Sequence, residues 1–377
     1  MRIAMLTNNS LPAREGIGRH VTEIGRRLQA RGHEVVVLAR GDAFGNWRES
    51  EIDGLRVRHF PHWPLRPLHQ AASGLVLRRW LKDGADGARL LHVHLPLLPP
   101  LPCPLPSVVT VHSPMLSDTA AIREPGLKPR LVRANALLFS RSYEQWHLDH
   151  ARVVTTVSAG VADELQAGYR LQGRPPVVIE NGVDTDLFSF RPGGLRAPEI
   201  LYVGRLGYRK GAARLLGAFA RLVAARPELR LVMVGEGPLA VELEATARQL
   251  GVRSRVEFTG FLEPRVVRDR LHRATCFVNP ADYESGPLTL LEAMAAGTPV
   301  VSTRTGLVQS MGAAPPLLVA DASEAALAAA VVEALAEPAA TARRVQAARD
   351  LVEARFDWSR AVDRLCTVYE TTARLAA

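Results

Sequence analysis

The chain has 377 residues, of which 47% are hydrophobic and 23% are charged, and its formal net charge is +9 at pH 7. This ordinary globular composition is long enough for two domains, and the excess of positive charge favours acidic partners such as phosphates, anionic lipids or nucleic acid. Three cysteines, Cys103, Cys276 and Cys366, lie far apart without a CxxC pair, which favours a reduced cytosolic setting over a disulfide framework or a zinc site.

Predicted strands and helices alternate from the first residues onward. The opening MRIAMLTNN indicates a first strand rather than a signal peptide, because polar residues follow after only five apolar ones. Short β-branched runs alternate with amphipathic stretches, which is typical of parallel sheets covered by helices on both faces. In chain order the predicted strands are 2–8, 34–40, 55–60, 90–96, 107–113, 153–159, 199–206, 230–237, 256–261, 275–281 and 299–306.

One uncharged stretch is long enough to suggest a membrane span. No charged residue occurs between Arg89 and Asp118, yet six prolines lie between Leu95 and Pro106. A lipid-exposed helix cannot accommodate so many missing N–H donors and ring clashes. The stretch therefore predicts a strand, a proline-rich connector and a second strand.

The turn-rich segment RPGGLRAP, residues 191–198, is the predicted boundary between two doubly wound α/β domains. The domains are expected at 1–190 and 191–357, and a last helix, 358–377, follows the second domain's final elements. Two such domains place two sets of strand carboxyl ends across a cleft, where ligands of these sheets bind.

A glycine pair follows the first predicted strand. Gly16 and Gly18 open a helix whose free N–H groups and dipole suit an anion. Val21 stands where the third glycine of the dinucleotide fingerprint belongs, so this is not that motif. Close helix packing explains a lone GxG equally well, and both interpretations stay open.

Two cations flank the loop after the strand that ends at Gly204. Arg205 suits a diphosphate by bidentate contact and Lys210 by its point charge. Only three of the 47 basic residues are lysines, so a lysine at this position is informative. The alternative is a solvated basic loop.

The segment ADYESGPLTLLEAMAAGTPVV, residues 281–301, holds two glutamates eight positions apart. Glu284 is predicted in a loop, and Glu292 inside an apolar helix that Gly286 and Pro287 begin, with the proline in the first turn. A buried carboxylate must have donors, and vicinal sugar hydroxyls match its two oxygens. The helix amides favour phosphate. The alternative is that Glu292 pairs with an arginine of the fold.

ESGPLTLLE resembles the E-x7-E motif of retaining glycosyltransferases of family 4, which have the GT-B fold. The blocks VIENGVDTDLF, VGRLGYRKG, VMVGEGP, FTGF and EAMAAGTPVV are similar to others of that family, in order and spacing over nearly the whole chain. The resemblance implies two Rossmann-like doubly wound parallel-sheet domains facing a central cleft. It also implies a hexosyltransferase that moves a sugar from a nucleotide-diphosphate sugar to an acceptor hydroxyl, in bacterial glycan, glycolipid or cell-envelope polysaccharide biosynthesis.

The same resemblance implies roles for individual residues. Glu284 contacts hydroxyls of the donor sugar and Glu292 those of the ribose. Arg205 and Lys210 neutralise the diphosphate, while His112 lies at the reaction centre. The other expected donor-site residues are Gly16, Gly18, Gly204, Gly235, Gly237, Pro238, Phe261, Leu262, Gly286, Pro287, Leu288 and Thr289. The final helix, from Trp358, is expected to cross back to the first domain.

This sequence also departs from the family pattern. Gly286-Pro287 replaces the commoner aromatic-glycine, and the proline-rich run replaces a helix of many relatives, which puts the acceptor side in doubt. No nucleophilic carboxylate is identifiable, so retention implies a same-face dissociative route.

No metal cofactor is expected. Asp184-Thr185-Asp186 matches the DxD metal motif of a different glycosyltransferase fold, and His92, His94 and His112 suggest zinc, but no fourth ligand is evident. His94 is expected to line the cleft. Asn181 and Gly182 indicate a turn, or in the family a role in domain closure.

Two basic-apolar segments, 63–84 and 120–141, suit an anionic membrane surface. We hypothesise a cytoplasmic protein, peripheral on the inner face of the membrane, with a glycan or lipid-linked acceptor; ordinary solvated helices are the alternative. A sugar-phosphate synthase and a nucleotide-sugar epimerase are rival functions. A nucleic-acid-binding protein ranks last, because Glu284 and Glu292 would repel phosphate backbones. The donor base, the sugar, the linkage and the oligomeric state stay open.

Overall fold

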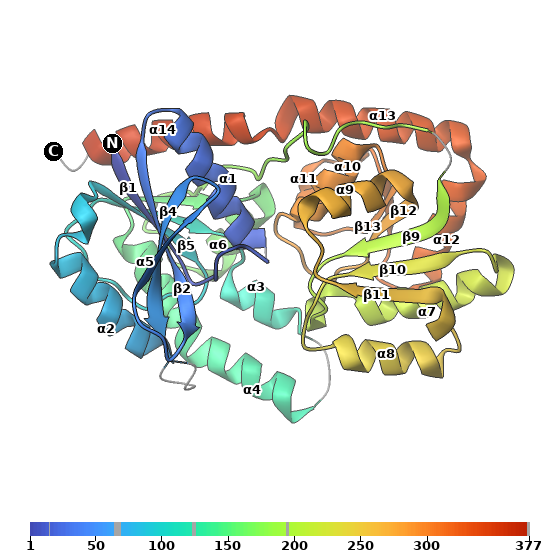
Figure 1. Ribbon diagram of the computed structural model, residues 1–377, viewed down its shortest axis with the longest axis horizontal. Helices are drawn as coiled ribbons and strands as arrows, with labels where there is room; N and C mark the ends of the chain where they lie inside the picture. Colours follow the sequence, from blue (N-terminus) through green and yellow to red (C-terminus); the bar gives the residue numbers. More distant parts are fainter. Residues whose placement is uncertain (15, 64–68, 123–125, 194–195, 375–377) are drawn as a thin grey trace. The chain divides into compact units, whose positions relative to one another are not determined.

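The computed structural model describes residues 1–14, 16–63, 69–122, 126–193 and 196–374. The chain divides into two compact α/β units (Figure 1): unit 1 comprises 1–181 and 358–377, and unit 2 comprises 182–357. Parts of the predicted boundary segment, of both basic-apolar segments and of the last helix lie outside the described residues.

Unit 1 is built on one sheet in the order β3-β4-β2-β1-β5-β6-β7-β8, parallel except for the β3–β4 pair. Its strands are β1 Arg2–Thr7, β2 Glu34–Ala43, β3 Arg48–Ile52, β4 Leu55–His62, β5 Leu90–Leu95, β6 Ser107–Val111, β7 Val153–Thr156 and β8 Val177–Val178. Its helices are α1 Gly16–Ala30, α2 His69–Lys82, η1 Ala85–Gly87, α3 Met115–Ala120, α4 Leu127–Asn135, η2 Ala136–Ser140, α5 Arg141–His150, α6 Ala159–Gly168 and α14 Trp358–Arg374.

Unit 2 has a parallel sheet in the order β11-β10-β9-β12-β13-β14. Its strands are β9 Ala197–Val203, β10 Arg230–Val234, β11 Val256–Gly260, β12 Ala274–Asn279, β13 Val300–Thr303 and β14 Leu318–Ala320. Its helices are η3 Tyr208–Lys210, α7 Ala212–Ala225, α8 Ala240–Gln249, η4 Arg253–Arg255, α9 Pro264–Arg273, α10 Leu288–Ala296, α11 Gly306–Ser310, α12 Glu324–Ala336 and α13 Pro338–Arg355.

The strand order confirms the predicted doubly wound architecture. In each sheet the chain starts in the middle, builds outward to one side and then returns to build the other side. The order therefore reverses between β1 and β5 in unit 1, and between β9 and β12 in unit 2. Ligands of such sheets bind outside the carboxyl ends of the strands at this reversal. All predicted strands are present, and β3, β8 and β14 are additional edge strands.

The apolar side chains of each strand supply two layers of core. In β9, Ile200 and Tyr202 face the layer formed with α7, α8 and α12, while Leu201 and Val203 face the layer formed with α9, α10, α11 and α13. This division follows from the alternation of side chains along a strand. It explains why the central strands are nearly continuous runs of apolar residues.

The proline-rich stretch has the predicted structure. β5 and β6 pair in parallel, with His94 opposite Thr110, and residues 96–106 between them form neither helix nor strand. Among the described residues no single helix is long and apolar enough to cross a membrane. The pair α12 and α13, bent by 101°, reaches that length and composition only when both helices are taken together.

The unit boundary lies between Asn181 and Gly182, earlier than the expected boundary between residues 190 and 191. The reason is that the following segment packs in unit 2: the Val183 N–H donates to the Phe356 carbonyl at 2.9 Å, and Phe188 is buried in that unit's core. The last helix, α14, belongs to unit 1, where Arg31, the residue after α1, forms an ion pair with Asp363 at 2.6 Å.

Candidate functional site

In unit 2 the strand reversal brings together the two most informative charged residues of the sequence. Lys210 follows β9 and Glu284 follows β12, and these strands are neighbours in the sheet. The Lys210 ammonium forms an ion pair with Glu284 Oε1, and the two side chains are 18% and 13% exposed. The sequence predicted both residues for a ligand site but did not predict that they contact each other.

The two loops that carry this pair are locked together by backbone contacts. Gly211 has φ +66°, and a Cβ there would lie 1.9 Å from the Pro280 carbonyl oxygen, so this position requires glycine. The Asp282 N–H donates to the Arg209 carbonyl at 2.9 Å. Arg214 donates to the Pro280 carbonyl at 2.8 Å and to Asp282 Oδ1 at 2.5 Å. These contacts fix the position of Lys210 relative to Glu284.

The electrostatic environment of Lys210 favours an anion. Burial lowers the pKa of its ammonium, and the nearby positive charges of Arg209 and Arg205 lower it further, against the opposing effect of Glu284. Arg205 is exposed, and its carbonyl accepts a hydrogen bond from the buried Tyr202 hydroxyl at 3.0 Å. A bound diphosphate would relieve the repulsion among the three cations.

The helix that carries Glu292 begins one residue later than expected. Pro287 is the capping residue, in extended conformation, and Leu288 and Thr289 are the first two helical residues. The Pro287 side chain makes no capping hydrogen bond at this end of α10. Glu292 is 2% exposed among apolar side chains, as the sequence predicted.

The glycines expected at the donor site have a structural reason of their own. A Cβ at Gly235 would lie 2.0 Å from the Gly204 carbonyl oxygen, and a Cβ at Gly237 would lie 2.2 Å from that of Leu206. Both glycines therefore allow close packing of the loops after β9 and β10.

Other expected donor residues lie in the same loops. Pro238, after β10, is exposed, and Phe261 and Leu262, after β11, are half-buried. Sequence reasoning missed Gly306, where a Cβ would lie 2.4 Å from the Glu284 carbonyl oxygen. The detectable signal was a glycine directly after a strand, in STRTG.

In unit 1 the strand reversal gathers histidines. His94 lies near the end of β5, His112 follows β6, and His20 is on α1, the helix after β1. His94 Nδ1 and His112 Nε2 are 3.2 Å apart, and the centroids of the His20 and His112 rings are 4.5 Å apart. All three side chains are at most 5% exposed. His20 was not among the predicted site residues, and its signal was the HV that follows the glycine pair.

His92, two residues before His94, is fully engaged elsewhere. The Thr155 hydroxyl uses its hydrogen to donate to the Val109 carbonyl, so its oxygen accepts from the Thr110 hydroxyl. Because the Thr110 hydroxyl has then used its own hydrogen, its oxygen accepts from His92 Nε2–H. His92 Nδ1 consequently accepts from the Tyr369 hydroxyl at 2.6 Å. This chain of hydrogen bonds ties α14 to β5 beneath the histidine group.

Burial keeps these rings neutral. It lowers the pKa of His20 to about 4 and that of His92 to about 3, and it lowers the pKa values of His94 and His112 well below the ordinary value. The His20 Nδ1–H donates to Asn181 Oδ1 at 2.8 Å, which only partly offsets the effect of burial on His20. Near pH 7 the group is therefore a set of uncharged donors and acceptors.

The two glycines that begin α1 have different surroundings. A Cβ at Gly18 would lie 2.9 Å from the Ala13 Cβ, which supports the packing interpretation for that residue. A Cβ at Gly16 would meet no atom within 4 Å. Gly16 thus keeps its expected accessibility to a ligand, whereas Gly18 is needed for packing.

The structure changes the candidates for a metal site. Asp184 Oδ1 accepts from the N–H groups of Asp186 and Leu187, so this carboxylate of the DxD sequence caps a turn. Within the described residues the one group of metal-ligand type is His20, His94 and His112, whose ligand atoms lie within 4.8 Å of one another. His92 does not belong to this group, because both of its ring nitrogens are hydrogen-bonded.

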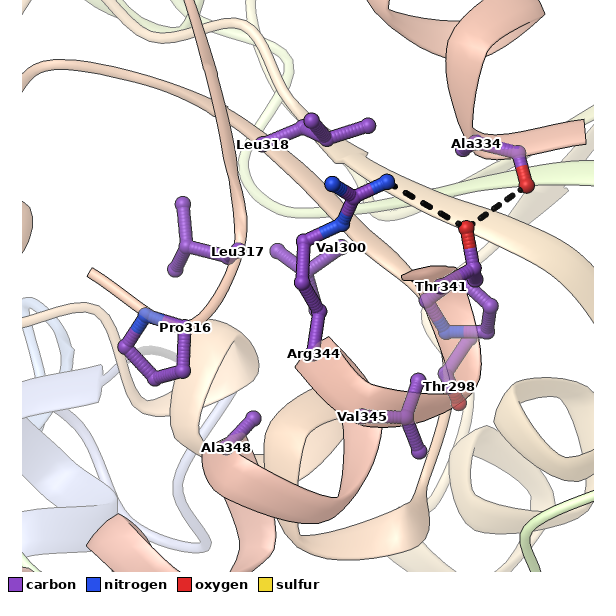
Figure 2. Close-up of a pocket in the computed structure, with 11 residues that line it drawn as sticks. Thr298, Val300, Pro316, Leu317, Leu318, Ala334, Thr341, Arg344, Val345 and Ala348 are labelled. Carbon is purple, nitrogen blue, oxygen red and sulfur yellow. Dashed lines mark hydrogen bonds between the residues drawn. The ribbon is translucent and has the colours of Figure 1, made fainter. Parts of the chain in front are cut away.

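Neither of two cavities lies at these strand ends. A cavity of about 10 Å³, large enough for one water, lies beside the starts of β13 and β14, where Arg344 and Thr341 are hydrogen-bonded to each other and Thr341 to the Ala334 carbonyl (Figure 2). A larger one of about 620 Å³ lies in unit 1 beside the proline-rich connector and Trp146.

Sequence comparison places the chain in a family. Residues 14–187 match the model of "Glycosyltransferase Family 4", and residues 190–351 match that of "Glycosyl transferases group 1". The chain is 31% identical to glycogen synthase of Mycobacterium tuberculosis, over 95% of this chain and 92% of that protein. It is 28% identical to phosphatidyl-myo-inositol mannosyltransferase of the same species, over 99% and 97%. The protein therefore belongs to glycosyltransferase family 4 and is a glycosyltransferase.

Solved structures confirm the GT-B fold. Sucrose-phosphate synthase from Thermosynechococcus elongatus superposes with a TM-score of 0.82 at 22% identity, covering 98% of each chain. HepE of Anabaena, solved in complex with UDP-glucose, superposes with a TM-score of 0.73 at 17% identity, covering 98% of this chain and 100% of that one.

Buried histidines should make unit 1 sensitive to acid, and His147 on α5 offers a test away from the His20 group. Its Nε2–H donates to the Pro99 carbonyl at 2.9 Å, and burial lowers its pKa to about 4. Between pH 6.5 and 4 the unfolded chain binds a proton at this ring and the folded chain does not. The free energy of unfolding should therefore fall as the pH drops through this window, by roughly 3 kcal/mol for this ring alone.

The measurement is urea unfolding of the wild type and of His147→Gln between pH 7 and 4. In His147→Gln the number of protons taken up on unfolding, obtained from the slope of unfolding free energy against pH, should be lower by about one. His150→Gln, on the exposed side of the same helix, should match the wild type. Equal pH dependence of all three proteins would contradict the neutral buried state of His147.

Proposed function

We propose that this glycosyltransferase moves a sugar from a nucleotide-diphosphate sugar to an acceptor hydroxyl, with retention and without an essential divalent metal. The observation that carries the proposal is the Lys210–Glu284 contact at the strand reversal of unit 2. It places a group suited to phosphate against a group suited to sugar hydroxyls. A nucleotide-diphosphate sugar has both chemistries joined by one bond.

The donor would exchange the ion pair for two better-matched contacts. The diphosphate takes the Lys210 ammonium together with the exposed Arg205, and a sugar hydroxyl donates to the carboxylate of Glu284. The first N–H groups of α10, which the Pro287 side chain does not cap, add a field of the same sign as the cations. Glu292, near the start of that helix, would accept from ribose hydroxyls.

The chemical task is to stabilise charge on the departing nucleotide diphosphate. Arg205, Lys210 and the start of α10 supply positive charge, and their positions are set before the donor binds. In unit 1, His112 would position the transferred sugar and Gly16 would approach the diphosphate through its backbone. HepE, a structure of the same fold, binds UDP-glucose, which supports a nucleotide sugar as donor.

The clamp is tested by substitution. We expect Lys210→Ala and Arg205→Ala each to lower kcat/KM for a nucleotide sugar by at least about a hundredfold, because each removes charge stabilisation of the leaving group. Lys82→Ala removes an exposed lysine of unit 1 and should leave kcat/KM unchanged. Thermal shifts with UDP, GDP, ADP and their sugars identify the donor first. Near wild-type kcat/KM in either clamp variant, with the fold intact by circular dichroism, would overturn this clamp.

A sugar-phosphate synthase is the second candidate function. It is favoured by the likeness to sucrose-phosphate synthase, although that likeness by itself establishes only the fold. The relation to phosphatidyl-myo-inositol mannosyltransferase favours a lipid-linked acceptor instead.

An acceptor screen with the identified donor decides between these candidates. We expect transfer to glycan or lipid-linked hydroxyls, and little transfer to soluble sugar phosphates. The measurement is product formation by mass spectrometry, with a donor-only reaction as the control. Turnover confined to sugar phosphates would establish the synthase, and sugar interconversion in the donor-only control would establish an epimerase.

An exposed apolar surface on unit 1 supports a membrane-proximal acceptor. We define the α4 patch as the exposed apolar side chains of α4 and η2, which are Leu127, Leu131, Leu137, Leu138 and Phe139, between 44% and 74% exposed. Arg130 and Arg141, also exposed, lie in the same stretch of helix. Apolar side chains flanked by arginines suit the interface of an anionic bilayer.

The other suggested membrane segment, residues 63–84, is less suited to a membrane surface. In α2 the side chains of Leu77, Trp80 and Leu81 are buried in the core of unit 1, and the Trp80 N–H donates to Asp86 at 3.2 Å. The described part of this segment is therefore a surface helix whose main apolar face is covered, and Leu75 is exposed. We propose peripheral attachment to the cytoplasmic leaflet through the α4 patch.

Co-sedimentation with anionic liposomes tests the attachment. Leu131→Glu with Leu138→Glu should lower the bound fraction severalfold, because each adds a negative charge to the contacting surface. Val241→Glu, at an 84% exposed position of α8 in unit 2, is the matched control and should bind like the wild type. Absence of wild-type binding at low salt, or equal binding by all variants, would remove the membrane proposal.

A further inference from the structure

The histidines at the strand reversal of unit 1 leave ring nitrogens unused. His20 Nε2 and His94 Nε2 are buried and make no hydrogen bond within the described structure. Burying an unsatisfied polar atom costs about 1–3 kcal/mol, so two such atoms in one group require an explanation. Both belong to rings that lie against His112.

The hydrogen bonds define which atoms are available. Asn181 accepts from His20 Nδ1–H, so His20 Nε2 carries a lone pair. The hydrogen bond between His94 Nδ1 and His112 Nε2 leaves the other nitrogen of His94 without a partner. His92 takes no part, because Tyr369 and Thr110 occupy both of its nitrogens.

We propose that His20, His94 and His112 form a binding site for a divalent transition metal of the zinc class. One nitrogen from each ring lies within 4.8 Å of the others. Nitrogens bound to one tetrahedral zinc at about 2.1 Å lie about 3.4 Å apart, so the widest separation closes by roughly 1.4 Å. Three imidazoles without a carboxylate suit zinc, copper or nickel, and they do not suit magnesium or calcium.

The surroundings of His20 resemble those of a metal-binding histidine. Such histidines donate their second N–H to a carbonyl or carboxylate that fixes the ring. In the same way, His20 donates its Nδ1–H to the Asn181 side-chain oxygen. A metal bound by the three rings would leave a fourth coordination position open.

Occupancy should inhibit the enzyme, and this consequence rests on the proposed function. A metal bound by His112 withdraws the ring that is expected to position the transferred sugar. Zinc would therefore be an inhibitor at this site, and not a cofactor of the transfer reaction.

The experiment is equilibrium dialysis of untagged protein against Zn²⁺, with the bound metal measured by elemental analysis. The wild type should bind one zinc per chain tightly, and His20→Gln and His94→Gln should each bind at least about tenfold more weakly. His150→Gln, at an exposed histidine, and Cys366→Ser, beside His33 at 3.7 Å, should bind like the wild type. No tight zinc in the wild type, or unchanged binding in both histidine variants, would overturn the site.

Cobalt keeps the proposal testable if a variant fails to fold. Co²⁺ in the wild type should give the visible bands of a tetrahedral nitrogen site without a thiolate charge-transfer band, and such a thiolate band would place the metal at a cysteine. Activity separates this inference from the proposed function. Zinc that binds at the histidines without inhibiting transfer would refute the role of His112, while the metal site would stand.

Discussion

The ion pair between Lys210 and Glu284 is the interaction on which the proposed donor site depends. Burying two charges costs several kcal/mol each, and attraction compensates only when the geometry is held accurately. The structure holds this geometry through Gly211, which packs closely against the Pro280 carbonyl, and through Arg214, which joins the loops after β9 and β12. A nucleotide diphosphate without a sugar would break the pair and leave Glu284 without its cation. Under the proposed function, a nucleotide sugar would satisfy both partners, so the pair would favour the nucleotide sugar over the nucleotide diphosphate.

The two units use the same topological position for different chemistry. In unit 2 the strand reversal carries charges on exposed and half-buried loops, as anion binding requires. In unit 1 it carries buried imidazoles whose pKa values are lowered, so the group is uncharged. Proximity to strand ends follows from the fold in both units. The electrostatic difference follows from how far each side chain lies from the strand ends, because His94 lies within β5 whereas Lys210 lies beyond the end of β9.

The sequence was sufficient for the fold, and it singled out Lys210 and Glu284, which the structure brings into contact. Continuous apolar strands separated by helices predict a parallel doubly wound sheet, and charges directly after strands predict its ligand edge. The sequence did not reveal contacts that depend on the adjacency of distant strands. The lock at Gly211, the approach of Gly306 to Glu284, and the position of His20 beside His112 all require knowledge of which strands are neighbours. The edge strands β3, β8 and β14 were missed because they are short or, in β3, largely charged.

His20 also connects the histidine group to the places where the chain passes between its units. The chain leaves unit 1 after Asn181 and returns at Trp358. Within unit 1, His20 donates to Asn181, and its ring lies 5.5 Å from that of Trp358. On the unit 2 side, Val183 pairs with Asp357, so the two passages run side by side there. Asn181 and Trp358, the residues at these two points of the chain, therefore both contact the buried ring of His20, which also lies against His112.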